Sequence, residues 1–125
     1  MLYESLGNRL ARQRVVHCIA VMSGPLAAHR GTLIKTIGDE IMCTFPSAEA
    51  ALHAACEMQA AVESGRPGGD TPMYIRVGFN YGEVIREAND VHGDAVNMAA
   101  RITEVARARQ ILATQWAVDA LPAEL

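Results

Sequence analysis

Apolar residues recur along this chain with two periods, one typical of helices and one typical of strands. A spacing of three or four residues places apolar side chains on one face of a helix. Alternation at every second residue, or a short apolar run, is typical of strands. The helical spacing predicts helices over residues 3–29, 46–64, 94–106 and 116–121. The strand pattern predicts strands over residues 32–37, 40–45, 73–79, 82–87 and 110–113.

Proline and glycine divide the helical stretches. Pro25 falls inside the first of them, which predicts two segments because proline has no backbone N–H to donate. The sequence His29-Arg30-Gly31 is typical of a helix C-terminus, with cations followed by glycine. Glycine and proline between residues 65 and 70 predict a flexible loop rather than a domain boundary.

Turn residues join the predicted strands into hairpins. Gly38 and Asp39 predict a two-residue type II′ turn, which would leave Asp39 exposed at a hairpin tip. Asn80 and Tyr81 predict a second hairpin between the strands on either side of them. The resulting order, α-α-β-β-α-β-β-α-β-α, predicts an α+β fold in which helices cover a largely antiparallel sheet.

Composition narrows the class of protein. The length of 125 residues fits a single domain, residues 1–125, and about half the residues are hydrophobic, enough for a core. The net charge of −3 argues against a nucleic-acid binder, which carries a basic patch. No apolar run reaches the roughly 18 residues of a membrane span, and residues 1–4 do not open a signal peptide. Three widely spaced cysteines predict buried thiols in a cytoplasmic protein.

Two charged residues on the first predicted hairpin are candidates for nucleotide chemistry. Asp39 could be an ordinary turn residue that bonds its own backbone, or it could be one ligand of a magnesium ion. With a triphosphate, Mg²⁺ usually takes only one or two protein carboxylates. Lys35 could be a solvated lysine, or it could donate to adenine N1. Because lysine has donors only, it suits adenine better than guanine, whose N1 is itself a donor.

Three further candidates lie near the predicted helix 94–106. Asn97 and Arg101 are four residues apart and therefore share a helix face. They could form a plain polar stripe, or Arg101 could bind phosphate with its forked guanidinium while Asn97 orients a ribose or the attacking oxygen. Asp90 could be a loop acid favoured by the helix dipole, or it could accept from the adenine 6-amino group.

These residues lie in three motifs that together resemble the class III nucleotidyl cyclases. The stretch from Gly31 to Glu40 resembles the family's metal-binding hairpin. Residues 76–84 resemble its R-x-G-x-x-x-G-E-V hairpin, and residues 90–101 resemble its transition-state helix. Order and spacing agree across essentially the whole chain. The resemblance implies a ferredoxin-like or palm-like cyclase fold of the α+β class, incomplete in this chain.

The resemblance also implies roles for single residues. Asp39 would be one of two metal aspartates, and two ions, Mg²⁺ or Mn²⁺, would be expected at each site. Lys35 and Asp90 would select adenine, since guanylate cyclases carry glutamate where Lys35 stands. Asn97 and Arg101 would act in the transition state.

The implied activity is that of an adenylate cyclase in intracellular signalling. The enzyme would convert ATP to 3′,5′-cyclic AMP and pyrophosphate by attack of the ribose 3′-oxygen on the α-phosphorus. In this family one subunit supplies the metal aspartates and the other supplies base-reading and transition-state residues. Both kinds occur here, so a homodimer with two sites is implied. A regulatory domain in a longer parent protein would also fit.

The chain departs from the family pattern in several places. Residues 2–7 resemble the stretch that follows the family's first strand, so that strand and its metal aspartate are missing. The family's triphosphate lysine is missing too, since Lys35 is the single lysine of the chain, and Asn80 stands where many relatives have histidine. A missing central strand predicts unpaired backbone groups and an apolar gap. We therefore expect the isolated chain to be weakly active or inactive.

Two other functions are open at this point. The chain could be a non-catalytic, cyclase-like module that binds nucleotide or only dimerises. A diguanylate cyclase shares the palm-like core but is disfavoured, because Gly38-Asp39-Glu40 only partly matches a G-G-D-E-F loop.

Overall fold

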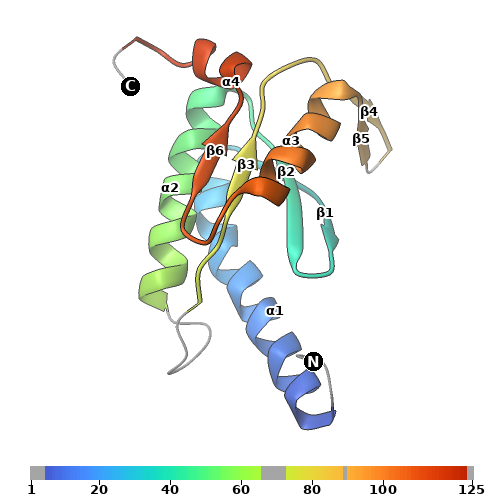
Figure 1. Cartoon of the computed structure of the whole chain (residues 1–125), viewed down its shortest axis with the longest axis vertical. Coiled ribbons are helices and arrows are strands. Elements are labelled where there is room, and N and C mark those ends of the chain that lie inside the picture. The colour runs from blue at the N-terminus through green and yellow to red at the C-terminus, as the bar shows by residue number, and fades with distance from the viewer. Residues whose placement is uncertain (1–4, 66–72, 89, 124–125) are drawn as a thin grey trace.

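A computed structural model describes residues 5–65, 73–88 and 90–123, with side chains from residue 9 onward (Figure 1). Helices and strands are interspersed along the chain, and the α+β class is confirmed. The elements are α1 Ser5–Ala28, β1 Thr32–Ile37, β2 Glu40–Thr44, α2 Ala48–Gly65, β3 Val77–Phe79, β4 Ile85–Glu87, β5 Asp90–His92, α3 Asp94–Val105, β6 Ile111–Ala113 and α4 Gln115–Asp119. The predicted loop at 65–70 lies outside the described residues except for Gly65.

The first helix is continuous, so the predicted division into two segments is wrong. Pro25 lies in the last turn of α1, where its missing N–H removes one hydrogen bond close to the end of the helix. Met22 and Leu26, on either side of Pro25, are both buried in the core and hold this turn in place. The helix ends where the sequence indicated: Arg30 adopts a left-handed φ of 59°, and the Gly31 N–H donates to the Leu26 carbonyl over 2.8 Å.

The main core lies between α1, α2 and β2. Cys18, Met22 and Leu26 of α1 meet Ala54, Met58 and Val62 of α2 in one buried cluster, against which Ile41, Cys43 and Phe45 pack. In Figure 1, α1 and α2 lie behind the strands, and α3 lies in front of β3. Among the strands that carry candidate residues, β1 contacts α1 and β5 contacts α3.

The first predicted hairpin is confirmed. β1 and β2 pair antiparallel, and Ile37 pairs with Glu40, which leaves a two-residue loop at the tip. Gly38 has a φ of 59° and Asp39 is not among the residues with positive φ, the combination that a type II′ turn requires. This turn exposes the side chain of Asp39 to solvent.

The second predicted hairpin is wrong. β3 pairs in parallel with β6, and β4 pairs antiparallel with β5, a strand that the sequence pattern did not predict. Residues 80–84 separate β3 from β4, whereas the pairing of Glu87 with Asp90 closes β4 and β5 with only two residues between them. The shorter connection favours the β4–β5 hairpin, because two-residue turns bring neighbouring strands together most directly.

Close contact between α3 and β3 depends on Gly78. A β carbon added at Gly78 would overlap the backbone nitrogen of Thr103 and the side chain of Ile102. The Thr103 hydroxyl lies 2.9 Å from the Ala99 carbonyl oxygen and 3.4 Å from that of Gly78. Glycine at this position therefore lets the helix lie directly on the strand.

A cavity of about 920 Å³ lies among β2, β3, α1 and α3. Its lining is largely apolar and includes Ile41, Cys43, Phe45, Ile75 and Phe79. Within the described part of the chain, β2 pairs only with β1 and β3 only with β6. The described strands therefore form separate pairs, with the apolar cavity beside β2 and β3.

Candidate functional site

Lys35 and Asp90 form the centre of the candidate site. They are 55 residues apart in sequence, yet the Lys35 Nζ lies 3.1 Å from the Asp90 Oδ2. Lys35 comes from the middle of β1 and Asp90 from the start of β5. A register shift between Leu33 and Lys35 interrupts the regular alternation of β1, as in a β-bulge, which can redirect a side chain locally. Tertiary structure thus brings into contact two residues to which the family resemblance gave one shared role.

Asp90 is held in its ionised form by two hydrogen bonds. The Val91 N–H donates to Asp90 Oδ1 over 2.8 Å, and Lys35 donates to Oδ2. The Val91 hydrogen bond first, and the Lys35 hydrogen bond second, hold the pKa of Asp90 below its usual value. The side chains of Lys35 and Asp90 keep 39% and 36% of their surface exposed, so both can still reach a ligand. The ammonium has further N–H donors and the carboxylate further lone pairs.

Asp39 lies at the tip of the β1–β2 hairpin and lines the large cavity. Its exposed carboxylate offers the oxygen donors that Mg²⁺ and Mn²⁺ prefer. Among the residues that the structure describes, no three histidine, cysteine, aspartate or glutamate side chains gather as a metal site. A single carboxylate such as that of Asp39 supplies only part of the coordination shell of such an ion.

Asn97 and Arg101 lie on the exposed surface of α3, one turn apart. The helix starts two residues after β5, so it follows Asp90 closely in the chain. Within residues 5–65, 73–88 and 90–123, no hydrogen bond or ion pair joins Asn97 or Arg101 to Lys35, Asp39 or Asp90. The structure therefore brings Lys35 and Asp90 together, and leaves Asp39 and the Asn97–Arg101 pair on separate elements.

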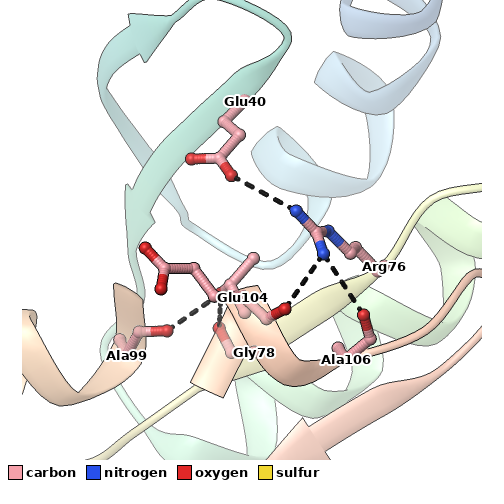
Figure 2. Close-up of polar contacts among 7 residues, drawn as sticks. Glu40, Arg76, Gly78, Ala99, Glu104 and Ala106 are labelled. Atoms are coloured by element: carbon pink, nitrogen blue, oxygen red, sulfur yellow. Dashed lines mark hydrogen bonds and ion pairs between the residues drawn. The ribbon is translucent and has the colours of Figure 1, made fainter. Parts of the chain in front are cut away.

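Arg76 and Asn80 also shape the surroundings of α3, although neither was among the site residues predicted from the sequence. Arg76 reaches the carbonyls at the C-terminal end of α3 and the side chain of Glu40 (Figure 2). Asn80 donates to the Ala95 carbonyl over 3.2 Å and accepts a hydrogen bond from Thr114, the N-cap of α4. Arg76 is the arginine of the R-x-G-x-x-x-G-E-V motif, and that motif was the signal that could have pointed to it.

Comparison with known proteins identifies the family. Residues 9–124 match the family described as Adenylate and Guanylate cyclase catalytic domain. The chain belongs to this family. The resemblance found in the sequence motifs is thereby confirmed.

Individual cyclases match much of the chain. An adenylate cyclase of Streptomyces coelicolor is 33% identical over 81 residues, which are 65% of this chain and 20% of that protein. A pH-sensitive adenylate cyclase of Mycobacterium tuberculosis is 28% identical over 122 residues, 95% of this chain and 30% of that protein. The chain spans 15% to 30% of the length of the curated relatives it matches.

Solved cyclase structures share the fold. An adenylate/guanylate cyclase/hydrolase from Silicibacter pomeroyi superposes with a TM-score of 0.78 at 26% identity, covering 91% of this chain and 69% of that one. This cyclase domain therefore keeps the family fold around its cavity. Of the helices in the described part, none is both long enough and apolar enough to cross a membrane.

Proposed function

We propose that this cyclase domain is an adenylate cyclase that converts ATP to 3′,5′-cyclic AMP and pyrophosphate at a site shared between two copies of the chain. The observation that carries the proposal is the contact of Lys35 Nζ with Asp90 Oδ2 at 3.1 Å. This contact sets a hydrogen-bond donor directly beside an acceptor.

That pair is complementary to one edge of adenine. Adenine presents N1, an acceptor, next to its 6-amino group, a donor. Lys35 would donate to N1, and Asp90 would accept from the amino group. Guanine presents an N1–H donor next to the O6 acceptor, so it would set donor against donor and acceptor against acceptor. A site that leaves polar groups unpaired in this way rejects the wrong base strongly.

Asp39 would supply one ligand of a divalent metal site. Its carboxylate is exposed at the hairpin tip, and oxygens of a bound triphosphate would complete the coordination of Mg²⁺ or Mn²⁺. When bound, two such ions would favour ionisation of the ribose 3′-hydroxyl and neutralise charge on the triphosphate.

Asn97 and Arg101 would act on the reacting groups. In the proposed reaction the ribose 3′-oxygen bonds to the α-phosphorus, and the bond from that phosphorus to the oxygen shared with the β-phosphate breaks. Pyrophosphate leaves, and the 3′-hydroxyl proton passes to solvent. Arg101 would donate to the phosphate oxygens as their charge develops, and Asn97 would orient the ribose.

A symmetric dimer would assemble these groups. Asp39 lies on the hairpin tip and Asn97 and Arg101 lie on α3, and no polar contact joins them within one described chain. In a two-fold dimer each copy could give Asp39 to one site and its α3 residues to the other.

A second candidate is a non-catalytic nucleotide-binding or dimerisation module. It is favoured by the cavity of about 920 Å³, which lies directly beside the hairpin that carries Asp39.

Cyclic AMP formation tests the proposal. The purified chain and the Asp39→Ala variant would be incubated at high concentration with ATP and Mn²⁺. Asp119→Ala, which removes an acidic side chain on α4, is the matched control. Turnover that disappears in Asp39→Ala and persists in Asp119→Ala supports the cyclase. ATP binding without turnover supports the second candidate, and no ATP binding at all contradicts both nucleotide functions.

A further inference from the structure

Arg76 links three elements around the candidate site. It lies directly before β3, and its Nη1 donates to the Glu104 carbonyl over 3.2 Å and to the Ala106 carbonyl over 3.4 Å. Its Nη2 lies 4.0 Å from Glu40 Oε1. Figure 2 shows the guanidinium between Glu40 on one side and the two carbonyls on the other.

The chemistry of arginine fits this position. The last carbonyls of a helix have no partner within the helix and carry partial negative charge, so a cation there is favourable. The planar guanidinium presents several N–H donors in fixed directions and can serve separate acceptors at once. Lysine would keep the charge but has no such fork.

The hairpin tip has little other lateral support. Among the described residues, the polar side-chain contact from residues 37–40 to another element is the Glu40–Arg76 pair. On one side the tip borders the large cavity, which Asp39 and Glu40 both line. The pair is half exposed, with 44% and 48% of the two side chains accessible, so its energy is modest. The pair matters because it connects the hairpin tip to Arg76, which also contacts the C-terminal end of α3.

We propose that Arg76 is a positioning residue that holds the Asp39 hairpin at a fixed place relative to the C-terminal end of α3. The inference rests on the proposed function, because Asp39 is adjacent to Glu40 and α3 carries Asn97 and Arg101. In the proposed dimer, Asp39 of one chain and α3 of the same chain serve different sites. Arg76 therefore joins the metal-binding half of one site to the phosphate-binding half of the other.

The test uses the full chain and four variants: Arg76→Met, Arg76→Lys, Glu40→Gln and the double variant Arg76→Met with Glu40→Gln. Arg109→Met is the matched control, because Arg109 is an exposed arginine whose ion pair with Glu63 lies elsewhere. Binding of Mn²⁺ in the presence of ATP would be followed by electron paramagnetic resonance. Amide hydrogen exchange would be followed at residues 37–41 and 102–106.

Arg76→Met should weaken Mn²⁺ binding about twofold to fivefold and speed exchange in both segments. Glu40→Gln should weaken Mn²⁺ binding similarly but speed exchange in the hairpin alone, since α3 keeps its cap. The double variant should bind Mn²⁺ no worse than Arg76→Met, and Arg76→Lys should recover part of the binding. Arg109→Met should match the unaltered chain.

Other results would overturn the proposal. If the unaltered chain binds Mn²⁺ with ATP and Arg76→Met binds it equally well, Arg76 does not position Asp39. Additive losses in the double variant would show that Arg76 and Glu40 act separately. If the unaltered chain binds no Mn²⁺ with ATP, the proposed function fails, and the exchange data alone decide whether Arg76 joins the hairpin to α3.

Discussion

At the scale of single residues, the contact between Lys35 and Asp90 carries the most information about substrate. Neither residue is diagnostic alone, since a strand lysine and a loop aspartate are common on protein surfaces. At 3.1 Å they form a donor–acceptor pair that matches adenine. Among the described residues, Lys35 and Asp90 should therefore mainly determine whether ATP or GTP is preferred.

Exchanging the pair should change the preferred base. Lys35→Glu combined with Asp90→Cys replaces the donor with an acceptor and the acceptor with a weak thiol donor, which suits guanine N1–H and O6. We expect the ratio of kcat/KM for ATP to that for GTP to fall at least about tenfold. Product formation from each nucleotide would be measured under identical conditions. An unchanged ratio would contradict the assignment of Lys35 and Asp90 as the base-selecting residues.

The same contact predicts a pH dependence of stability. The pKa of Asp90 is lowered by the Val91 and Lys35 hydrogen bonds. A lowered carboxyl pKa contributes stability that is complete above the unfolded value, about 3.9, and is lost as pH falls through the folded value. The difference in unfolding free energy between the unaltered chain and Asp90→Asn should stay constant from pH 7 to 5 and change only below about pH 4. Denaturant titrations at several pH values would check this, and a change already present between pH 7 and 5 contradicts it.

At the scale of elements, the approach of α3 to β3 positions the candidate phosphate-binding residues. Gly78 leaves room for the Thr103 backbone, and Arg76 caps the carbonyl end of the helix. The orientation of Asn97 and Arg101 thus depends on contacts at the other end of the same helix. A change that separates α3 from β3 should disturb both residues together.

Gly78→Ala should destabilise the chain by about 1 to 3 kcal/mol, because the added β carbon would overlap Thr103. Gly24→Ala is the matched control. Gly24 lies inside α1 with nothing within 4 Å of an added β carbon, so alanine there should be neutral or stabilising by up to about 1 kcal/mol. Urea unfolding would measure both changes, and equal effects at the two positions would show that α3 does not press on β3.

At the scale of the whole molecule, Asp39 and the Asn97–Arg101 pair lie on separate elements, and the fold contains a large cavity. Two of the strand pairs are antiparallel and one is parallel, and the described strands do not merge into one sheet. A shared site between two copies would explain why Asp39 and Arg101 make no polar contact within one chain.

Complementation between inactive variants tests the shared site. Asp39→Ala and Arg101→Ala should each abolish cyclic AMP formation, because each damages both sites of a homodimer. Mixed in equal amounts, they should recover about a quarter of the unaltered activity, since half the dimers are mixed and each mixed dimer has one intact site. Mixtures that stay inactive while forming mixed dimers would indicate sites within single chains.

The sequence by itself determined most of the helices, the first hairpin and the family. The helix stop after Ala28, the Gly38–Asp39 turn and the apolar spacing of α2 and α3 all depend on residues within a few positions of each other. Such features need no knowledge of distant contacts. Motif order sufficed for the resemblance that the family match confirmed.

Only the tertiary structure decided which segments meet. The strands of residues 77–79 and 85–87 each had several possible partners, and local pattern does not rank them; backbone pairing and helix packing chose β6 and β5. Continuity of α1 through Pro25 came from burial of its neighbours against α2. The Lys35–Asp90 contact and the reach of Arg76 to Glu40 and α3 join residues far apart in sequence, and such contacts exist only once the whole chain has packed.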